Sequence, residues 1–86
     1  MRQGPSVLRP AEVAARIVYF RKKKGLKSFE LAEACGVTPG AVSRWESGEA
    51  EPSHENLARV AHACGVDLAE FWAAPIVFMP AEAGGR

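Results

Sequence analysis

The apolar residues of this chain recur at helical spacing, in short runs that glycines and prolines separate. Leu31, Ala32 and Cys35 form one apolar stripe on a short helix, and Val42 and Trp45 lie three residues apart on the next one. The pattern predicts helices over residues 10–24, 28–35 and 39–47, a fourth between residues 53 and 64, and a fifth that begins near residue 67. The positions expected to face inward form one core: Val13, Ile17, Phe20, Leu31, Ala32, Val37, Val42, Trp45, Leu57, Val60, Ala61, Val66, Leu68 and Phe71.

The segment between the second and third predicted helices carries the turn chemistry of helix ends. Gly36 suits the left-handed conformation just past a helix, and Val37 can pack back onto that helix. Thr38 suits an N-cap, and Pro39 suits the first helical position because its missing N–H costs no hydrogen bond there. Gly48 ends the third helix as Gly36 ends the second. The sequence therefore predicts two short helices joined by a tight turn, with a polar face on the second of them.

Polar residues also mark the starts of the last two helices. Ser53 is the predicted N-cap of the fourth helix, where Asn56 only loosely completes a capping box. Asp67 and Glu70 form a better capping pair for the fifth helix.

Taken in order, these residues resemble the phage-repressor or Cro-like (XRE-type) helix-turn-helix family over about residues 13–71. The landmarks, in chain order, are Ile17-x-x-Phe20-Arg21, Gly25-Leu26, Leu31-Ala32, Gly36-Val37, Val42-Ser43-Arg44-Trp45-Glu46-x-Gly48, Pro52, Leu57, Ala61 and Gly65-Val66. No single landmark is specific, and their order and gaps together carry the resemblance. It implies an all-α, five-helix, lambda-repressor-like helix-turn-helix domain that lays its third helix into DNA.

The predicted helices divide the chain into three parts. We expect a flexible basic arm over residues 1–9 and the helix-turn-helix DNA-binding domain over residues 10–74. A short apolar C-terminal extension over residues 75–86 would combine a dimerisation segment with a loose tail.

Composition fits one ordinary globular domain: 86 residues, of which 48% are hydrophobic and 24% charged. No apolar run approaches the roughly 20 residues that span a bilayer, and the amino terminus lacks the apolar core of a secretory signal. We therefore expect a cytoplasmic protein without a membrane partner, bacterial or phage-encoded and associated with the nucleoid. No nucleophile with a placed base and no phosphate-binding loop stands out, so we expect neither an enzyme nor a cofactor or small-molecule substrate.

The two cysteines occur in similar seven-residue segments, Leu31-Ala-Glu-Ala-Cys35-Gly-Val37 and Val60-Ala-His-Ala-Cys64-Gly-Val66. We interpret both as small apolar residues at buried helix ends. The alternatives are a disulfide, which a reducing compartment disfavours, and a metal or redox site with His54 and His62, which lacks a close CxxC pair. No metal site is expected.

The net charge of +1 conceals a division, because residues 1–29 carry eight Lys or Arg and one Glu, whereas residues 30–86 carry three and nine acids. The candidate phosphate-binding residues lie at the end of the basic part: Arg21, Lys23, Lys24, Lys27 and Ser28. Cations at a helix C-terminus also complement the helix dipole without any ligand. Ser28 stands where the family favours a phosphate-contacting glutamine, and its hydroxyl can instead cap the second helix.

The family pattern also pairs the arginine found here at Arg21 with the glutamate found at Glu46. The resemblance implies a bidentate ion pair that joins the first helix to the third and leaves guanidinium N–H groups for a phosphate.

The third predicted helix departs from the family in its opening turn. Pro39, Gly40 and Ala41 occupy positions from which the family commonly sends polar side chains into the major groove. Arg44 is then the strongest base-reading candidate, with Ser43 and Thr38 as short helpers. Arg44 either binds a guanine edge or holds a phosphate. The small residues at 40 and 41 would let the helix sit deeper in the groove and leave more specificity to DNA shape.

Beyond the fifth helix the chain is strongly apolar. The predicted dimer interface comprises Trp72, Ile76, Val77, Phe78 and Met79, with Trp72 as its anchor. The alternative is that this segment covers its own core.

Two functions remain for comparison. The first is a sequence-specific DNA-binding transcriptional regulator that acts as a homodimer on a partly palindromic operator through its third helix. The alternative is a protein-interaction module with a helix-turn-helix fold and weak or no specific DNA binding.

Overall fold

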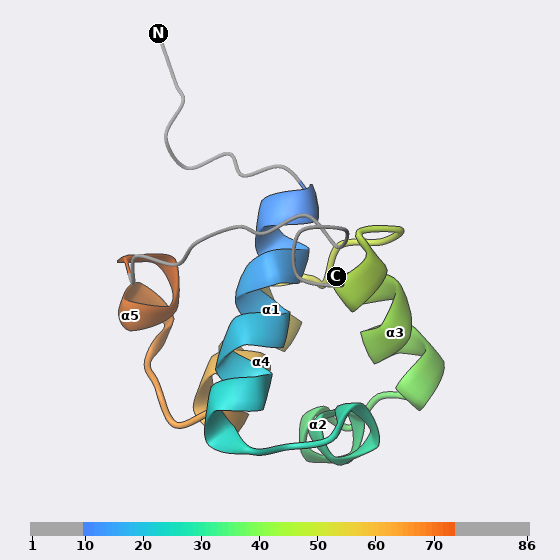
Figure 1. The fold of residues 1–86 in the computed structure, drawn as a ribbon, viewed down its shortest axis with the longest axis horizontal. Helices are drawn as coiled ribbons and strands as arrows, with labels where there is room; N and C mark the ends of the chain where they lie inside the picture. The colour runs from blue at the N-terminus through green and yellow to red at the C-terminus, as the bar shows by residue number, and fades with distance from the viewer. Residues whose placement is uncertain (1–9, 74–86) are drawn as a thin grey trace, which may run out of the picture.

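The computed structural model describes residues 10–73, which form five α-helices. These are α1 (Pro10–Lys24), α2 (Ser28–Cys35), α3 (Pro39–Ser47), α4 (His54–Ala63) and α5 (Leu68–Ala73). Helix α1 runs through the middle of the domain, with α3 on one side, α5 on the other and α4 behind it (Figure 1). Helix α3 packs on α1 and α2, α4 packs on α2, and α5 packs on α4. The predicted all-α, five-helix architecture is confirmed.

The turn between α2 and α3 forms as the sequence predicts. Gly36 has a φ of 72°, and the N–H of Val37 donates to the carbonyl of Ala32 at 3.0 Å, which satisfies a carbonyl at the end of α2. Thr38 has extended backbone, and its Oγ1 accepts from the N–H of Ala41 at 3.1 Å. Pro39 follows as the first residue of α3. These contacts fix the direction in which α3 leaves α2.

The start of α2 differs from the prediction. Lys27 is the N-cap residue, without a side-chain cap, so Ser28 lies inside the helix as its first residue. The N–H of Lys27 donates to Oε1 of Glu30 at 2.7 Å. The predicted capping role of Ser28 is therefore wrong, because the carboxylate at the third helical position satisfies the end of the helix from within.

The caps of the last two helices are confirmed. Ser53 Oγ accepts from the N–H of Asn56 at 3.1 Å, and Asp67 Oδ1 accepts from the N–H of Glu70 at 2.7 Å. The fourth helix is slightly shorter than predicted, since it ends at Ala63.

The core lies where the four longer helices and α5 meet. The predicted core residues are buried except Val37, Val66 and Leu68, which are partly buried and pack against its edge. Ala14, Cys35 and Cys64 are buried in addition. The rings of Phe20 and Phe71 stack at 5.3 Å between centroids, which joins α1 to α5. Among residues 10–73 no helix has the length and apolar character needed to cross a membrane.

Candidate nucleic-acid interface

Helix α3 has one buried face and one exposed face. Val42 is fully buried and Trp45 is 5% exposed, so two side chains three residues apart hold the helix against the core. Thr38, Pro39, Gly40, Ser43 and Arg44 are exposed, and Ala41 is partly buried. The structure thus brings the six predicted base-reading residues onto or beside the outer face of one short helix.

Arg44 is the only cation on this face, and its side chain is exposed. Within residues 10–73, its guanidinium has no hydrogen bond or ion pair to another residue. Its carbonyl is occupied instead, accepting from the N–H groups of Glu49 at 2.9 Å and Ala50 at 3.2 Å. The backbone of Arg44 is therefore fixed at the end of α3 while its charged group remains available to a ligand.

Gly40 lies in the open first turn of α3. A Cβ atom there would meet only Oγ1 of Thr38, at 3.8 Å, which is ordinary van der Waals contact. Packing within the domain therefore does not require a glycine at this position.

The predicted ion pair between α1 and α3 is present. Nε of Arg21 donates to Oε2 of Glu46 at 2.5 Å and Nη2 donates to Oε1 at 3.1 Å. Nη1 of Arg21 also donates to the carbonyl of Leu26 at 2.9 Å, in the connection between α1 and α2. The two side chains are only 13% and 14% exposed. Arg21 thus ties three parts of the domain together, and one hydrogen on each terminal nitrogen remains for another acceptor.

The basic cluster that the sequence groups together is divided in the structure. Lys27 and Ser28 lie at the amino end of α2. In contrast, Nζ of Lys23 lies 5.5 Å from the ring centroid of Tyr19, and Nζ of Lys24 would lie 3.6 Å from a Cβ on Gly65. Lys23 and Lys24 are therefore placed toward α1 and the α4–α5 turn, whereas Arg21 contacts α3.

Three exposed residues near the helix-turn-helix are not among the interface residues that the sequence predicts. Glu49 and Glu51 are exposed in the connection that follows α3, and Phe29 is 55% exposed in the first turn of α2. The acidic excess after residue 29 was visible in the sequence but could not be placed relative to α3. Phe29 lies outside the apolar stripe of Leu31, Ala32 and Cys35. The helical pattern in the sequence was therefore sufficient to place its ring off the buried face of α2.

The two cysteines are free and buried, which confirms their interpretation as core residues. Burial raises the pKa of the Cys35 thiol above its ordinary value. Burial, with a smaller contribution from nearby Cys35, raises the pKa of Cys64 to about 11. Both thiols are therefore protonated, and weakly reactive, near neutral pH.

These features define a helix-turn-helix domain with an exposed third helix. The Helix-turn-helix family model matches residues 17–71. The chain belongs to this family of DNA-binding, repressor-like transcription regulators.

Individual relatives agree with this assignment. An uncharacterized HTH-type transcriptional regulator of Haemophilus influenzae is 44% identical over 39 residues, which are 45% of this chain and 16% of that protein. The chain thus spans a small part of the length of this curated relative.

Among solved structures, the clp gene regulator ClgR from Corynebacterium glutamicum is 42% identical with a TM-score of 0.70, over 78% of this chain and 71% of that one. The DNA-binding domain of the P22 C2 repressor is 28% identical with a TM-score of 0.69, over 79% of this chain and 90% of that one.

Proposed function

We propose that this protein is a sequence-specific transcriptional regulator that binds a partly palindromic operator as a homodimer, through α3. The observation that carries the proposal is the two-sided character of α3: Val42 and Trp45 are anchored in the core while the opposite face, with the unpartnered guanidinium of Arg44, is open. A rigid helix with one exposed cation is suited to entering a major groove.

In this proposal Arg44 reads a guanine through its N7 and O6 atoms, a contact worth roughly 1 to 3 kcal/mol of discrimination. Ser43 and the hydroxyl hydrogen of Thr38 are the short polar helpers. Pro39, Gly40 and Ala41 let the helix approach the bases closely. The open space around Gly40 supports this role, because no neighbour within the domain accounts for the missing side chain.

Phosphate contacts are assigned to the junction of α1 and α2. The amide groups at the amino end of α2, with Ser28 and Lys27, meet one phosphate, and the free hydrogens of Arg21 meet another. Lys23 and Lys24 are placed toward Tyr19 and Gly65, so we assign them a secondary, longer-range electrostatic role.

The homodimer is proposed because one short helix reads only a few base pairs. Two copies on half-sites one helical turn apart supply usable affinity and specificity. Trp72, the proposed anchor, is partly buried and contacts Phe71 edge-on at 5.1 Å. The other proposed interface residues, Ile76, Val77, Phe78 and Met79, lie outside the described residues. The proposed place of action is the bacterial cytoplasm.

Selection from a random-site duplex library, with the unmodified chain and Arg44→Ala, tests this function. We expect an enriched inverted repeat and the loss of preference for one base pair in each half-site when Arg44 is replaced. Arg44→Lys is the matched control: a phosphate contact tolerates it, whereas bidentate base reading does not. If no sequence is enriched, the regulator proposal is rejected.

The alternative is a protein-interaction module with weak or no specific DNA binding. The exposed ring of Phe29 and the acids Glu49 and Glu51 beside α3 favour it. A flat salt dependence of random-duplex binding would support this second function, because phosphate neutralisation releases counterions and makes binding steeply salt-dependent.

A further inference from the structure

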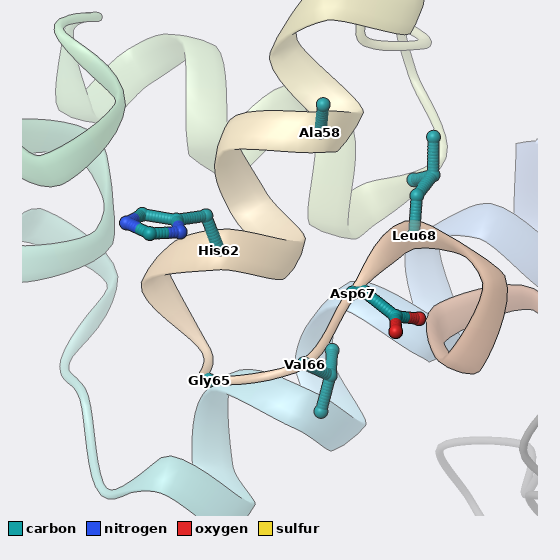
Figure 2. A pocket seen from close by; sticks show the side chains of 6 residues that line it. All are labelled: Ala58, His62, Gly65, Val66, Asp67 and Leu68. Carbon is teal, nitrogen blue, oxygen red and sulfur yellow. The ribbon is translucent and has the colours of Figure 1, made fainter.

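A hollow of about 450 Å³ lies where α4 meets the start of α5, away from α3. It is lined by Ala58, His62, Gly65, Val66, Asp67 and Leu68 (Figure 2). Helix α3 packs on α1 and α2 rather than on α5, so an occupant of this hollow would leave the exposed face of α3 free.

The walls of the hollow are mainly apolar. Figure 2 shows Ala58 on α4 and Leu68 on α5 pointing in the same direction, while the ring of His62 is turned away from Leu68. The carboxylate of Asp67 is engaged by the N–H of Glu70 at 2.7 Å. The hollow therefore offers mainly methyl and isobutyl groups, with His62 and Asp67 as its two polar lining residues, and an apolar segment is the complementary ligand for its apolar part.

The apolar surface continues from the hollow along α5. Leu68 and Trp72 are four residues apart in this helix and lie on one face of it. Both are partly buried and pack against the core. A strip of apolar surface thus runs from the hollow to the end of α5, where the proposed dimer anchor lies.

The sequence immediately after α5 contains a segment of matching chemistry. Thirteen residues follow Ala73, and they include Pro75-Ile-Val-Phe-Met-Pro80, which has no charged or hydrogen-bonding side chain. Helix α5 carries the chain about 8 Å away from the hollow. To occupy its own hollow, the segment would have to reverse direction at once, beside Pro75.

A second copy meets the hollow without such a reversal. In an isologous pair whose twofold axis is perpendicular to α5, the two α5 helices are antiparallel. The end of α5 in each copy then lies beside the start of α5 in the other, so each chain leaves its helix next to the partner's hollow.

We propose that the hollow formed by Ala58, Val66 and Leu68 is the docking site for residues 76–79 of a second copy of this chain. In this arrangement the two copies exchange residues 76–79, each segment docking in the hollow of the other copy. The exchange rests on the proposed homodimer and specifies where the two copies contact each other. Four apolar side chains removed from water would join the contribution of Trp72.

A disulfide cross-link in the full chain tests the exchange. Ala58→Cys combined with Val77→Cys places one thiol in the hollow and one in the segment, and diamide oxidises the pair. We expect a covalent dimer on a denaturing gel without reductant, reversed by dithiothreitol. The unmodified chain and the pair Ala11→Cys with Val77→Cys are controls, since Ala11 is exposed at the start of α1. A cross-link within one chain, or none, overturns the proposal.

A second variant separates the docking site from the dimer itself. Ala58 is exposed, so Ala58→Arg fills the hollow without entering the core. We expect at least a tenfold weaker dimer by sedimentation, with the helical content of the folded chain unchanged. If the unmodified chain is a monomer at micromolar concentration, the homodimer fails together with the docking site. If it is a dimer that Ala58→Arg does not weaken, only the docking site is rejected.

Discussion

The ion pair between Arg21 and Glu46 gives the sharpest stability prediction. Replacing Arg21 with Ala removes both hydrogen bonds to Glu46 and the one to the carbonyl of Leu26. Alanine has a high helix propensity, so the helical backbone of α1 itself is not weakened. The effect measured is then that of the lost contacts.

The burial of the pair sets the expected size of the effect. Glu46 is 14% exposed, so Arg21→Ala leaves its carboxylate largely out of water and without its partner. Stranding one member of a fully buried pair costs roughly 3 to 5 kcal/mol and breaking an exposed pair roughly 0 to 1 kcal/mol. Because this pair is slightly exposed, we expect Arg21→Ala to lower the free energy of unfolding by about 3 kcal/mol, the lower end of the range for buried pairs. For a domain of this size, that loss lowers Tm by roughly 12 to 24 °C.

The chain contains a matched control of the same two residue types. Nη2 of Arg59 donates to Oε2 of Glu55 at 2.8 Å, but these side chains are 50% and 73% exposed. Arg59→Ala should therefore cost less than about 0.5 kcal/mol. Urea and thermal unfolding followed by circular dichroism measure both variants. Equal losses for Arg21→Ala and Arg59→Ala would refute the reasoning from burial.

A double-mutant cycle isolates the pair from the Leu26 contact. Glu46→Gln keeps the shape of the side chain and removes its charge, while Arg21 retains its hydrogen bond to Leu26. The coupling energy between Arg21→Ala and Glu46→Gln should exceed about 1 kcal/mol if the pair acts as one unit. Binding to DNA under conditions where both variants remain folded then separates a phosphate contact by Arg21 from its structural role.

Three further effects are expected. The double variant Glu49→Gln, Glu51→Gln should bind random duplex roughly two- to fivefold more tightly at low salt, because two charges that repel phosphates beside α3 are removed. Fluorescence anisotropy measures this affinity. The control Glu70→Gln, on α5, should change the affinity little. Cys64 has its pKa raised to about 11 from 9.0, so the unfolded chain loses the thiol proton first and stability falls as pH rises from 9 toward 11. The fall amounts to about 2 to 3 kcal/mol, and Cys64→Ala should remove that part of the alkaline loss in urea unfolding. Glu30→Ala should cost about 0.5 to 1 kcal/mol, since its carboxylate accepts from the N–H of Lys27, the N-cap residue of α2; an unchanged Tm would contradict this.

The fold was largely predictable because each helix end carries its own local signal. Gly36, Thr38 and Pro39 act through backbone conformation and hydrogen bonds to near neighbours, so their roles do not depend on the rest of the domain. The Arg21–Glu46 pair is a contact between distant residues, and only the family pattern indicated it. The capping role of Ser28 was wrong because α2 begins one residue earlier than a Ser28 cap requires: Lys27 has the extended N-cap conformation, and no pattern in the sequence specified it.

The placement of charge was the part that sequence could not supply. Lys23 and Lys24 are neighbours of Arg21 in sequence, yet successive residues of a helix point about 100° apart. Lys24 therefore reaches the α4–α5 turn while Arg21 reaches α3. Long flexible side chains choose among several surfaces, and that choice depends on tertiary neighbours that no local pattern encodes.

The exposed charges around α3 indicate how specificity would arise in this domain. Two exposed acids, Glu49 and Glu51, follow Arg44 in the connection after the same helix. Because non-specific affinity comes almost entirely from phosphate attraction, these acids weaken binding to every sequence alike. In the proposed function, a hydrogen bond from Arg44 to a base would form only at the correct site. Weaker phosphate attraction at all sites would then leave the ratio of specific to non-specific affinity intact. Each half-site contact would be weak by itself, and joining two of them in the proposed dimer would restore affinity at the operator without restoring it at random DNA.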